Sequence, residues 1–247
     1  MDVSIILPAY NEADNICETV LSVKRVLCSL DYEIIVVDDG SRDFTRENMM
    51  KHPDERRVRV VGYNENVGKG YALKYGAARA KGNYVLFMDS DLDIEPSSLL
   101  QYLNIVKSSD LVIASKRHPK SKVDEPFIRR LLSFSFNVLV RILTNVTLAD
   151  TQAGLKGFNA GSLRQILPLL SVKKFAFDVE VLVVAKLKGM RVVELPVTVK
   201  LRTGFSARNV LRMVIDVLGI AYRLRIIRWY QRNIDNEKAE YTPVIAW

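Results

Sequence analysis

The first half of the chain alternates short apolar runs with segments of helical spacing, and this limits the folds it can adopt. A run such as Leu111–Ala114 is apolar at every position, which is typical of a strand buried on both faces of a sheet. Because strands and helices alternate, the pattern predicts an α/β fold with a mainly parallel central sheet flanked by helices. The predicted strands are Val3–Leu7, Glu33–Val37, Val58–Val61, Tyr84–Met88 and Leu111–Ala114, and the predicted helices are Asp14–Leu30, capped by Asp14, and Gly70–Ala80.

Polar clusters follow three of these strands. Pro8–Glu12 comes after the first strand, Asp38–Ser41 after the second and Asp89–Asp91 after the fourth. In a mainly parallel sheet, ligands bind beyond the carboxyl ends of the strands. Pro8–Glu12 lacks the glycines that bring a backbone close to a pyrophosphate in the Rossmann fold. A further segment, Asn66–Gly70, opens a predicted helix, where Lys69 and backbone N–H groups could meet an anion; the alternative is a plain turn.

Three aspartates, Asp89, Asp91 and Asp93, follow the fourth strand at alternate positions. In an extended segment, alternate side chains lie on one side of the chain. Three neighbouring carboxylates repel one another unless a cation lies among them. Mg²⁺ in proteins usually binds one or two carboxylates together with substrate phosphates. The pattern therefore indicates a divalent metal that holds a diphosphate, with a second interpretation in which Asp93 caps a following helix.

The charge is distributed unevenly along the chain. Residues 1–115 carry 13 Lys and Arg against 18 Asp and Glu, whereas residues 116–234 carry 22 against 7. A basic half favours an anionic partner, which could be a phosphorylated substrate, an anionic membrane surface or nucleic acid; solubility alone is the other reading. The basic residues lack the interleaved aromatic platform of a nucleic-acid binder, so we do not expect a nucleic-acid partner.

The second half contains two long predicted helices, Phe127–Val146 and Asn209–Tyr230, in which arginines interrupt apolar residues. Such helices suit a membrane surface, with arginines at the lipid headgroups, or ordinary packing on the sheet. No run approaches the roughly 18 apolar residues of a membrane-spanning helix, and the apolar start of the chain is too short for a signal peptide. Val192–Val199 is predicted as a strand around Pro196, and residues 235–247 as a loose polar tail.

Both cysteines, Cys17 and Cys28, fall on the predicted helix Asp14–Leu30. At the rise of an α-helix they would lie roughly 16 Å apart, too far for a disulfide bond. We expect free thiols in a reducing compartment.

Six short motifs, taken together, resemble the inverting family-two glycosyltransferases of the GT-A fold, which bind nucleotide-diphospho-sugars. The resemblance runs from residue 2 to about residue 207 and is nearest to the dolichyl-phosphate sugar synthases, meaning the dolichyl-phosphate glucosyltransferases and their mannosyl relatives. Each motif alone is weak, but all six occur in the family's order and spacing. The motifs are Ile6–Glu12, Val36–Ser41, Asn66–Gly70, Met88–Leu92, Asp150–Gly154 and Phe177–Glu180.

The resemblance implies roles for the matching positions. The nucleotide sugar would bind Pro8, Tyr10, Glu12, Asp38, Asp39, Lys69, Asp89 and Arg202. Mg²⁺ or Mn²⁺ would be held by Asp89 and Asp91, with Asp93, where mannosyl relatives commonly have Gln, as a third carboxylate. The acceptor phosphate would meet Arg117, Arg129, Arg130 and Ser133. The catalytic group would comprise Asp150 and Gln152, which position sugar or acceptor, and Asp178 and Glu180, which brace the site. Arg202, Gly204 and Ser206 resemble the family's mobile loop that closes on the phosphates.

The implied activity is transfer of a hexose from a nucleotide sugar to dolichyl or polyprenyl phosphate. The forms of Asp150–Lys156 and Phe177–Glu180 look closer to the glucosyl branch, which favours UDP-glucose over GDP-mannose. Residues 1–115 would bind the nucleotide sugar, residues 116–207 the acceptor, and residues 208–234 would form a basic helix at the membrane surface. The enzyme would be peripheral on the cytoplasmic face of a membrane, alone or with an anchoring subunit. Two alternatives stay open: a glycosyltransferase with another acceptor in polysaccharide or glycan synthesis, and a catalytically silent nucleotide-sugar-binding module.

Overall fold

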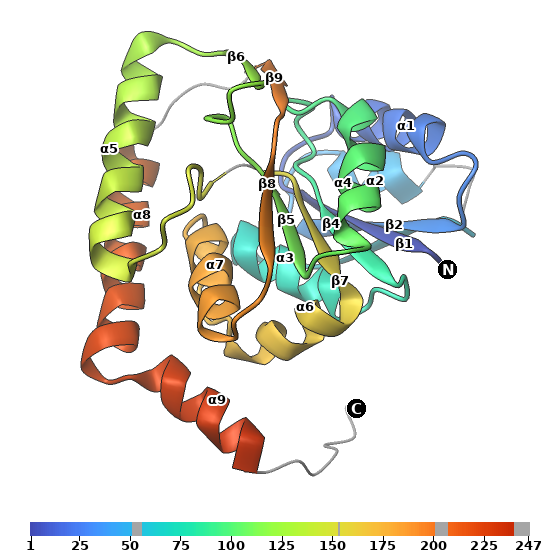
Figure 1. The fold of residues 1–247 in the computed structure, drawn as a ribbon. Helices are drawn as coiled ribbons and strands as arrows, with labels where there is room; N and C mark the ends of the chain where they lie inside the picture. Colours follow the sequence, from blue (N-terminus) through green and yellow to red (C-terminus); the bar gives the residue numbers. More distant parts are fainter. Residues whose placement is uncertain (51–55, 153, 201–206, 240–247) are drawn as a thin grey trace.

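A computed structural model describes residues 1–50, 56–152, 154–200 and 207–239 and confirms the α/β prediction (Figure 1). Seven strands form a central sheet in the order β3-β2-β1-β4-β7-β5-β8. β7 is antiparallel to β4 and β5, and the other neighbouring strands are parallel. A separate small sheet pairs β6 with β9. The strands are β1 (Val3–Ala9), β2 (Tyr32–Asp39), β3 (Val58–Tyr63), β4 (Tyr84–Phe87), β5 (Leu111–Ala114), β6 (Lys122–Asp124), β7 (Lys156–Asn159), β8 (Val192–Leu195) and β9 (Thr198–Lys200).

Helices cover both faces of the central sheet, because successive strand side chains enter two different cores. In β1, Ile6 packs in the core under α3, α6 and α7, whereas Ile5 and Leu7 pack in the core under α1 and α4. A strand buried on both faces has no polar alternation, which is why the strands could be recognised as apolar runs. The helices are α1 (Ile16–Val26), α2 (Thr45–Met50), α3 (Lys69–Ala77), α4 (Leu99–Val106), α5 (Phe127–Thr144), α6 (Ala160–Ile166), α7 (Phe177–Leu187), α8 (Ala207–Ala221) and α9 (Trp229–Ala239).

Helix α1 is shorter than the predicted segment Asp14–Leu30. Asn15 occupies its N-cap position and makes no side-chain capping bond, so Asp14 is not the cap. The helix ends before Cys28, and the expectation that both cysteines share one helix is therefore wrong, although both are free thiols. Helices α3 and α5 begin within one residue of their predicted starts and end two or three residues early.

The predicted strand Val192–Val199 is wrong, because Pro196 divides it. Proline has no N–H to donate to a strand ladder, so a central strand rarely continues through it. β8 joins the central sheet beside β5, and β9 leaves it to pair with β6. The turn between them is held by Ser121, whose Oγ accepts a hydrogen bond of 3.0 Å from the Val197 N–H.

The predicted single helix Asn209–Tyr230 is also wrong. α8 packs beside α5 (Figure 1) and ends at Ala221. A π-helical turn, Tyr222–Ile226, follows, and Arg228 takes a left-handed φ of 49° before α9 begins. α9 continues to Ala239, so the start of the expected loose tail is helical, and residues 240–247 lie outside the described part of the chain. Among the described helices, none combines the length and apolarity needed to cross a bilayer.

Candidate active site

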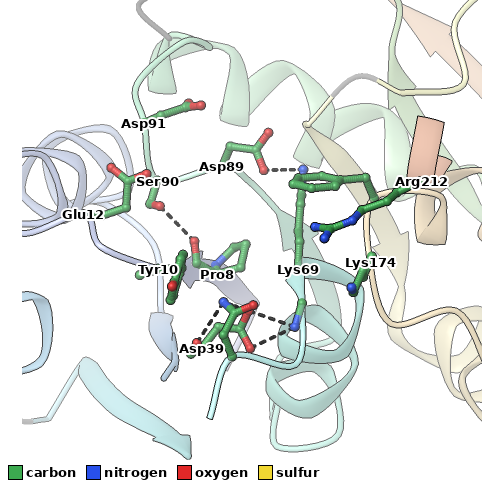
Figure 2. Close-up of a pocket in the computed structure, with 14 residues that line it drawn as sticks. Pro8, Tyr10, Glu12, Asp39, Lys69, Asp89, Ser90, Asp91, Lys174 and Arg212 are labelled. Atoms are coloured by element: carbon green, nitrogen blue, oxygen red, sulfur yellow. Dashed lines mark hydrogen bonds and ion pairs between the residues drawn. The ribbon is translucent and has the colours of Figure 1, made fainter. Parts of the chain in front are cut away.

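A cavity of about 520 Å³ opens beyond the carboxyl ends of β1 and β4, beside the start of α3 (Figure 2). Three of the polar clusters identified in the sequence meet there with the Asn66–Gly70 turn. The chain segments are tied together, since Ser90 Oγ donates a 2.8 Å hydrogen bond to the Pro8 carbonyl. We call this space the donor cavity, because residues that the family resemblance assigns to the nucleotide sugar line it. Its lining residues are Pro8, Ala9, Tyr10, Glu12, Asp39, Asn66, Gly68, Lys69, Asp89, Ser90, Asp91, Lys174, Phe175 and Arg212.

Asp39 builds the wall of the donor cavity. Its carboxylate accepts hydrogen bonds from the Val67 and Gly68 N–H groups, the Asn66 side chain and the Tyr63 hydroxyl, at 2.7 to 3.1 Å. These bonds fix the turn that leads into α3 and therefore fix the position of Lys69. Asp38, predicted beside it, is buried outside the cavity lining and accepts from the Ser41 N–H at 3.0 Å.

A chain of alternating charges crosses the floor of the donor cavity. Lys69 Nζ lies 2.5 Å from Asp89 Oδ1 and 4.0 Å from Asp178 Oδ2, and Asp178 Oδ1 in turn lies 2.8 Å from Nζ of the buried Lys156. Burial opposes the charge on Lys69, but Asp89 and Asp178 outweigh it and raise the pKa of the ammonium group. Asp178 therefore lies between two cations, Lys69 and Lys156, and its predicted bracing role stays a prediction.

Asp91 shares the donor cavity with Asp89, and burial together with the Asp89 charge raises the pKa of Asp91 to about 6. Glu12 lies at the same wall, and burial raises its pKa as well. A carboxyl that is costly to ionise beside another carboxylate favours a cation between them. The chemistry of Asp89 and Asp91 therefore fits a hard divalent metal.

Asp93 does not line the donor cavity with the other two aspartates, although its N–H donates a 3.0 Å hydrogen bond to Asp91 Oδ1. Leu92 has a left-handed φ of 59°, so the segment turns instead of staying extended, and alternate side chains do not share one side. Asp93 is buried and lines a smaller cavity of about 210 Å³ that also contains Glu18 and Glu95. Across the described residues, no group of three acidic, histidine or cysteine side chains is arranged to hold a metal.

The loop that contains Asp150 and Gly154 lies behind one lining residue of the donor cavity, because Gly154 abuts the Asp89 carboxylate. Asp150 is buried and accepts from the N–H groups of Lys116 and Gln152, both at 3.0 Å. Gln152 Nε2 lies 3.9 Å from Met213 Sδ. Neither Asp150 nor Gln152 lines the donor cavity, so the structure shows them organising the loop.

We expect Gly154→Ala to weaken donor and metal binding by at least about tenfold. A Cβ at residue 154 would overlap the Asp89 carboxylate, so the loop or Asp89 must move. Isothermal calorimetry with UDP and Mn²⁺ would measure the loss. Gly157→Ala is the matched control, because a Cβ there meets Leu86 and Val106 only at ordinary contact distance, and it should bind like the wild type. Equal affinity in both variants would contradict a close role for this glycine.

Glu180 lies away from the donor cavity, in the interior behind it. It is fully buried and accepts hydrogen bonds from Ser171 N and Oγ, Val172 N and the Tyr230 hydroxyl at 2.6 to 2.8 Å. Arg223 adds an ion pair at 3.4 Å. Glu180 thus ties α7 to α9 and to the loop that leads to Lys174, and its contacts are those of a bracing residue.

Three residues of the donor cavity, Lys174, Phe175 and Arg212, were not anticipated as site residues. Lys174 and Phe175 precede α7 and Arg212 lies on α8, so both cations reach the cavity only through tertiary packing. The basic charge of the second half was the one sequence signal for them. Arg202, predicted for the same site, lies outside the described residues.

A second cavity, of about 470 Å³, lies at the start of α5, and we call it the acceptor cavity. Arg117 stacks over the Phe134 ring at 5.2 Å, and the exposed Arg130 lies 3.8 Å from Glu125. Arg129, predicted with them, is on α5 but not in the lining. The lining consists of Lys116, Arg117, Ser121, Val123, Glu125, Arg130, Leu131, Ser133 and Phe134.

Comparison with known proteins identifies the family. Residues 4–167 match the domain described as Glycosyl transferase family 2. The chain belongs to this glycosyltransferase family. A dolichyl-phosphate beta-glucosyltransferase of Trichomonas vaginalis is 31% identical, covering 92% of this chain and 72% of that protein. The dolichyl-phosphate beta-glucosyltransferase of Saccharomyces cerevisiae is 29% identical (91% and 73% covered), and a dolichol-phosphate mannosyltransferase of Pyrococcus furiosus is 29% identical (93% and 64%).

Solved structures support the fold of this family-two glycosyltransferase. Glucosyl-3-phosphoglycerate synthase from Mycobacterium tuberculosis, in complex with Mn²⁺, uridine diphosphate and phosphoglyceric acid, has a TM-score of 0.69 at 20% identity and covers 90% of this chain and 77% of that one. The likeness confirms the predicted GT-A fold, and at 20% identity it supports no conclusion beyond the fold.

Proposed function

We propose that this family-two glycosyltransferase transfers glucose from UDP-glucose to dolichyl phosphate, with Mg²⁺ or Mn²⁺ bound at Asp89 and Asp91. The observation that carries the proposal is that one loop connects two differently charged cavities. Asp150 accepts from Lys116 of the acceptor cavity, and Gly154 abuts Asp89 of the donor cavity. Glucose as the transferred sugar is supported by the similar proteins from Trichomonas vaginalis and Saccharomyces cerevisiae, which are named dolichyl-phosphate beta-glucosyltransferases.

The donor cavity suits a nucleoside diphosphate. The exposed ring of Tyr10 offers a face for the base, and Lys69, Lys174 and Arg212 provide positive charge for the phosphates. A divalent metal, when bound by Asp89 and Asp91, would offset the charge that develops on the leaving diphosphate. Fixed cations aimed at this charge lower the barrier because they need not reorganise during the reaction.

The acceptor cavity suits a phosphate that carries a lipid chain. A phosphate monoester has a second pKa near 6 and is largely dianionic at neutral pH, so it can attack without a general base. It must instead be held by cations against the repulsion of the donor diphosphate. Arg117, Arg130 and the Ser133 hydroxyl would hold it, and Leu131 and Phe134 offer apolar contact for the chain.

We expect Arg130→Ala to raise the KM for dolichyl phosphate about tenfold while leaving the affinity for UDP unchanged. The guanidinium is exposed, but its partner Glu125 is largely buried, so the Tm of the variant must also be compared with that of the wild type. Steady-state kinetics with varied lipid, together with calorimetry for UDP, would separate the two sites. Arg164→Ala, an exposed arginine on α6, is the matched control. An equal loss for both substrates would contradict an acceptor-specific role.

We further propose that α5 and α8 lie on a membrane surface. The two helices pack side by side (Figure 1), and each carries a stripe of exposed apolar side chains at helical spacing. This position would bring lipid to the acceptor cavity at the start of α5. The free thiols Cys17 and Cys28 fit the cytoplasmic face, where thiols stay reduced. The stripes are Ile128, Leu131, Phe134, Val138 and Ile142 on α5, and Leu211, Ile215 and Leu218 on α8, continued by Tyr222 and Ile226.

The proposal is tested by transfer of radiolabelled sugar to dolichyl phosphate in detergent. UDP-glucose and GDP-mannose are supplied separately, each with Mn²⁺, Mg²⁺ or EDTA. We expect metal-dependent glucolipid from UDP-glucose alone. Product from GDP-mannose alone would overturn the assignment of UDP-glucose as donor. Product in EDTA would overturn the metal requirement, and the absence of lipid product from both donors would overturn dolichyl phosphate as the acceptor.

A further inference from the structure

Lys69 and a bridging metal ion need the same carboxylate. Lys69 Nζ contacts Asp89 Oδ1 at 2.5 Å, and the other oxygen, Oδ2, lies against Gly154. The oxygen of Asp89 that Lys69 contacts is the one farther from Gly154, and Asp89 and Lys69 both line the donor cavity (Figure 2). A metal held between Asp89 and Asp91 would compete with the ammonium group for this oxygen, because two cations cannot both lie close to it without strong repulsion.

A second carboxylate lies within reach of the Lys69 ammonium group. Asp178 Oδ2 is 4.0 Å from the ammonium and is itself held by Lys156, so it forms a fixed anionic partner on the far side. The backbone at the start of α3 is anchored, since Asp39 binds the Val67 and Gly68 N–H groups just before Lys69. A shift from Asp89 would thus involve only the side chain.

We propose that Lys69 is a displaceable internal cation that makes metal binding depend on the donor. It pairs with Asp89 until metal and diphosphate arrive together, and its ammonium then moves to the diphosphate and Asp178. A metal ion that arrives alone must displace the ammonium group without offering it a new partner, and it therefore binds weakly. Metal with nucleoside diphosphate supplies that partner, so each ligand strengthens the binding of the other. The inference rests on the proposed metal-dependent function and adds a residue that sets the order of binding.

Mn²⁺ binding to the full chain tests this without any transfer reaction. Free Mn²⁺ is measured by electron paramagnetic resonance, without nucleotide and with saturating UDP, and UDP affinity by calorimetry. In the wild type, UDP should tighten Mn²⁺ at least about tenfold. Lys69→Met should tighten Mn²⁺ alone about fivefold and weaken UDP about tenfold, so that the mutual strengthening falls below about threefold. These changes have opposite signs, which a purely structural defect cannot produce.

Two further variants control the result. Lys69→Arg keeps a cation and should retain weak binding of Mn²⁺ alone. Lys74→Met removes another lysine of α3, whose Nζ donates to the Leu170 carbonyl, and should leave Mn²⁺ binding unchanged. If Lys69→Met binds Mn²⁺ alone no more tightly than the wild type does, the inference is wrong. If Lys69→Met does not fold, Lys69→Arg takes its place, and tighter binding of Mn²⁺ alone by Lys69→Arg than by the wild type would overturn the inference. If the wild type binds no Mn²⁺ even with UDP, the metal-dependent function fails and the inference fails with it.

Discussion

Replacing Asp91 with Asn is expected to reduce sugar transfer by on the order of 1,000-fold, the scale seen when a fixed charge-stabilising group is lost. Asp91 and Asp89 line the donor cavity together, and burial near Asp89 makes the Asp91 charge costly in the protein alone. A bound cation offsets this cost, so the carboxylate contributes most when metal and diphosphate are present. The isosteric amide keeps the shape of the side chain and removes its charge.

Asp93→Asn is the matched control for Asp91→Asn. Asp93 belongs to the same run of alternating aspartates but lines the cavity that Glu18 and Glu95 also line, so Asp93→Asn should retain most of the activity. Calorimetry with UDP and Mn²⁺ should show lost metal binding for Asp91→Asn only. If both variants lost metal binding equally, the third carboxylate would be a ligand as the sequence first suggested, and the separation of the two cavities would not describe the working site.

The sequence predicted those parts of the fold that depend on local pattern. Most strands of the first half were recognisable because burial on both faces makes them predominantly apolar, and the polar clusters at their ends marked the donor cavity. The proposed metal pair, Asp89 and Asp91, follows from the same reasoning. The position of Asp93 could not be predicted, because a single left-handed residue, Leu92, decides whether alternate side chains stay together.

Other features depend on contacts between distant parts of the chain, which a local pattern does not contain. Lys174 and Arg212 reach the donor cavity only because the loop before α7 lies against the start of α3 and the helix α8 packs beside α7. In the same way, Glu180 is bound by Tyr230, fifty residues later. The motif Phe177–Glu180 marked Glu180 as important, but its partners, and therefore its role, required the structure.

Replacing Glu180 with Ala is expected to destabilise the protein by roughly 3–5 kcal/mol, the usual cost of removing one partner from a buried charged network. The substitution leaves the N–H groups of Ser171 and Val172 and the Tyr230 hydroxyl without their acceptor, and it removes the buried partner of the Arg223 ion pair. For a chain of this size, such a loss corresponds to a fall in Tm of roughly 10 °C. Urea unfolding and thermal unfolding would measure it.

Two variants decide whether Glu180 braces the fold or takes part in the reaction. Tyr230→Phe removes one of the hydrogen bonds to Glu180 and should cost less, about 1.5–3 kcal/mol. Glu47→Ala removes an exposed carboxylate of α2 and should leave Tm unchanged. Because the loop held by Glu180 leads to Lys174 and Phe175, Glu180→Ala should also raise the KM for the donor well below its melting temperature. A variant with wild-type Tm and no activity would instead make Glu180 part of the chemistry and would require it to reach the donor cavity from its buried position.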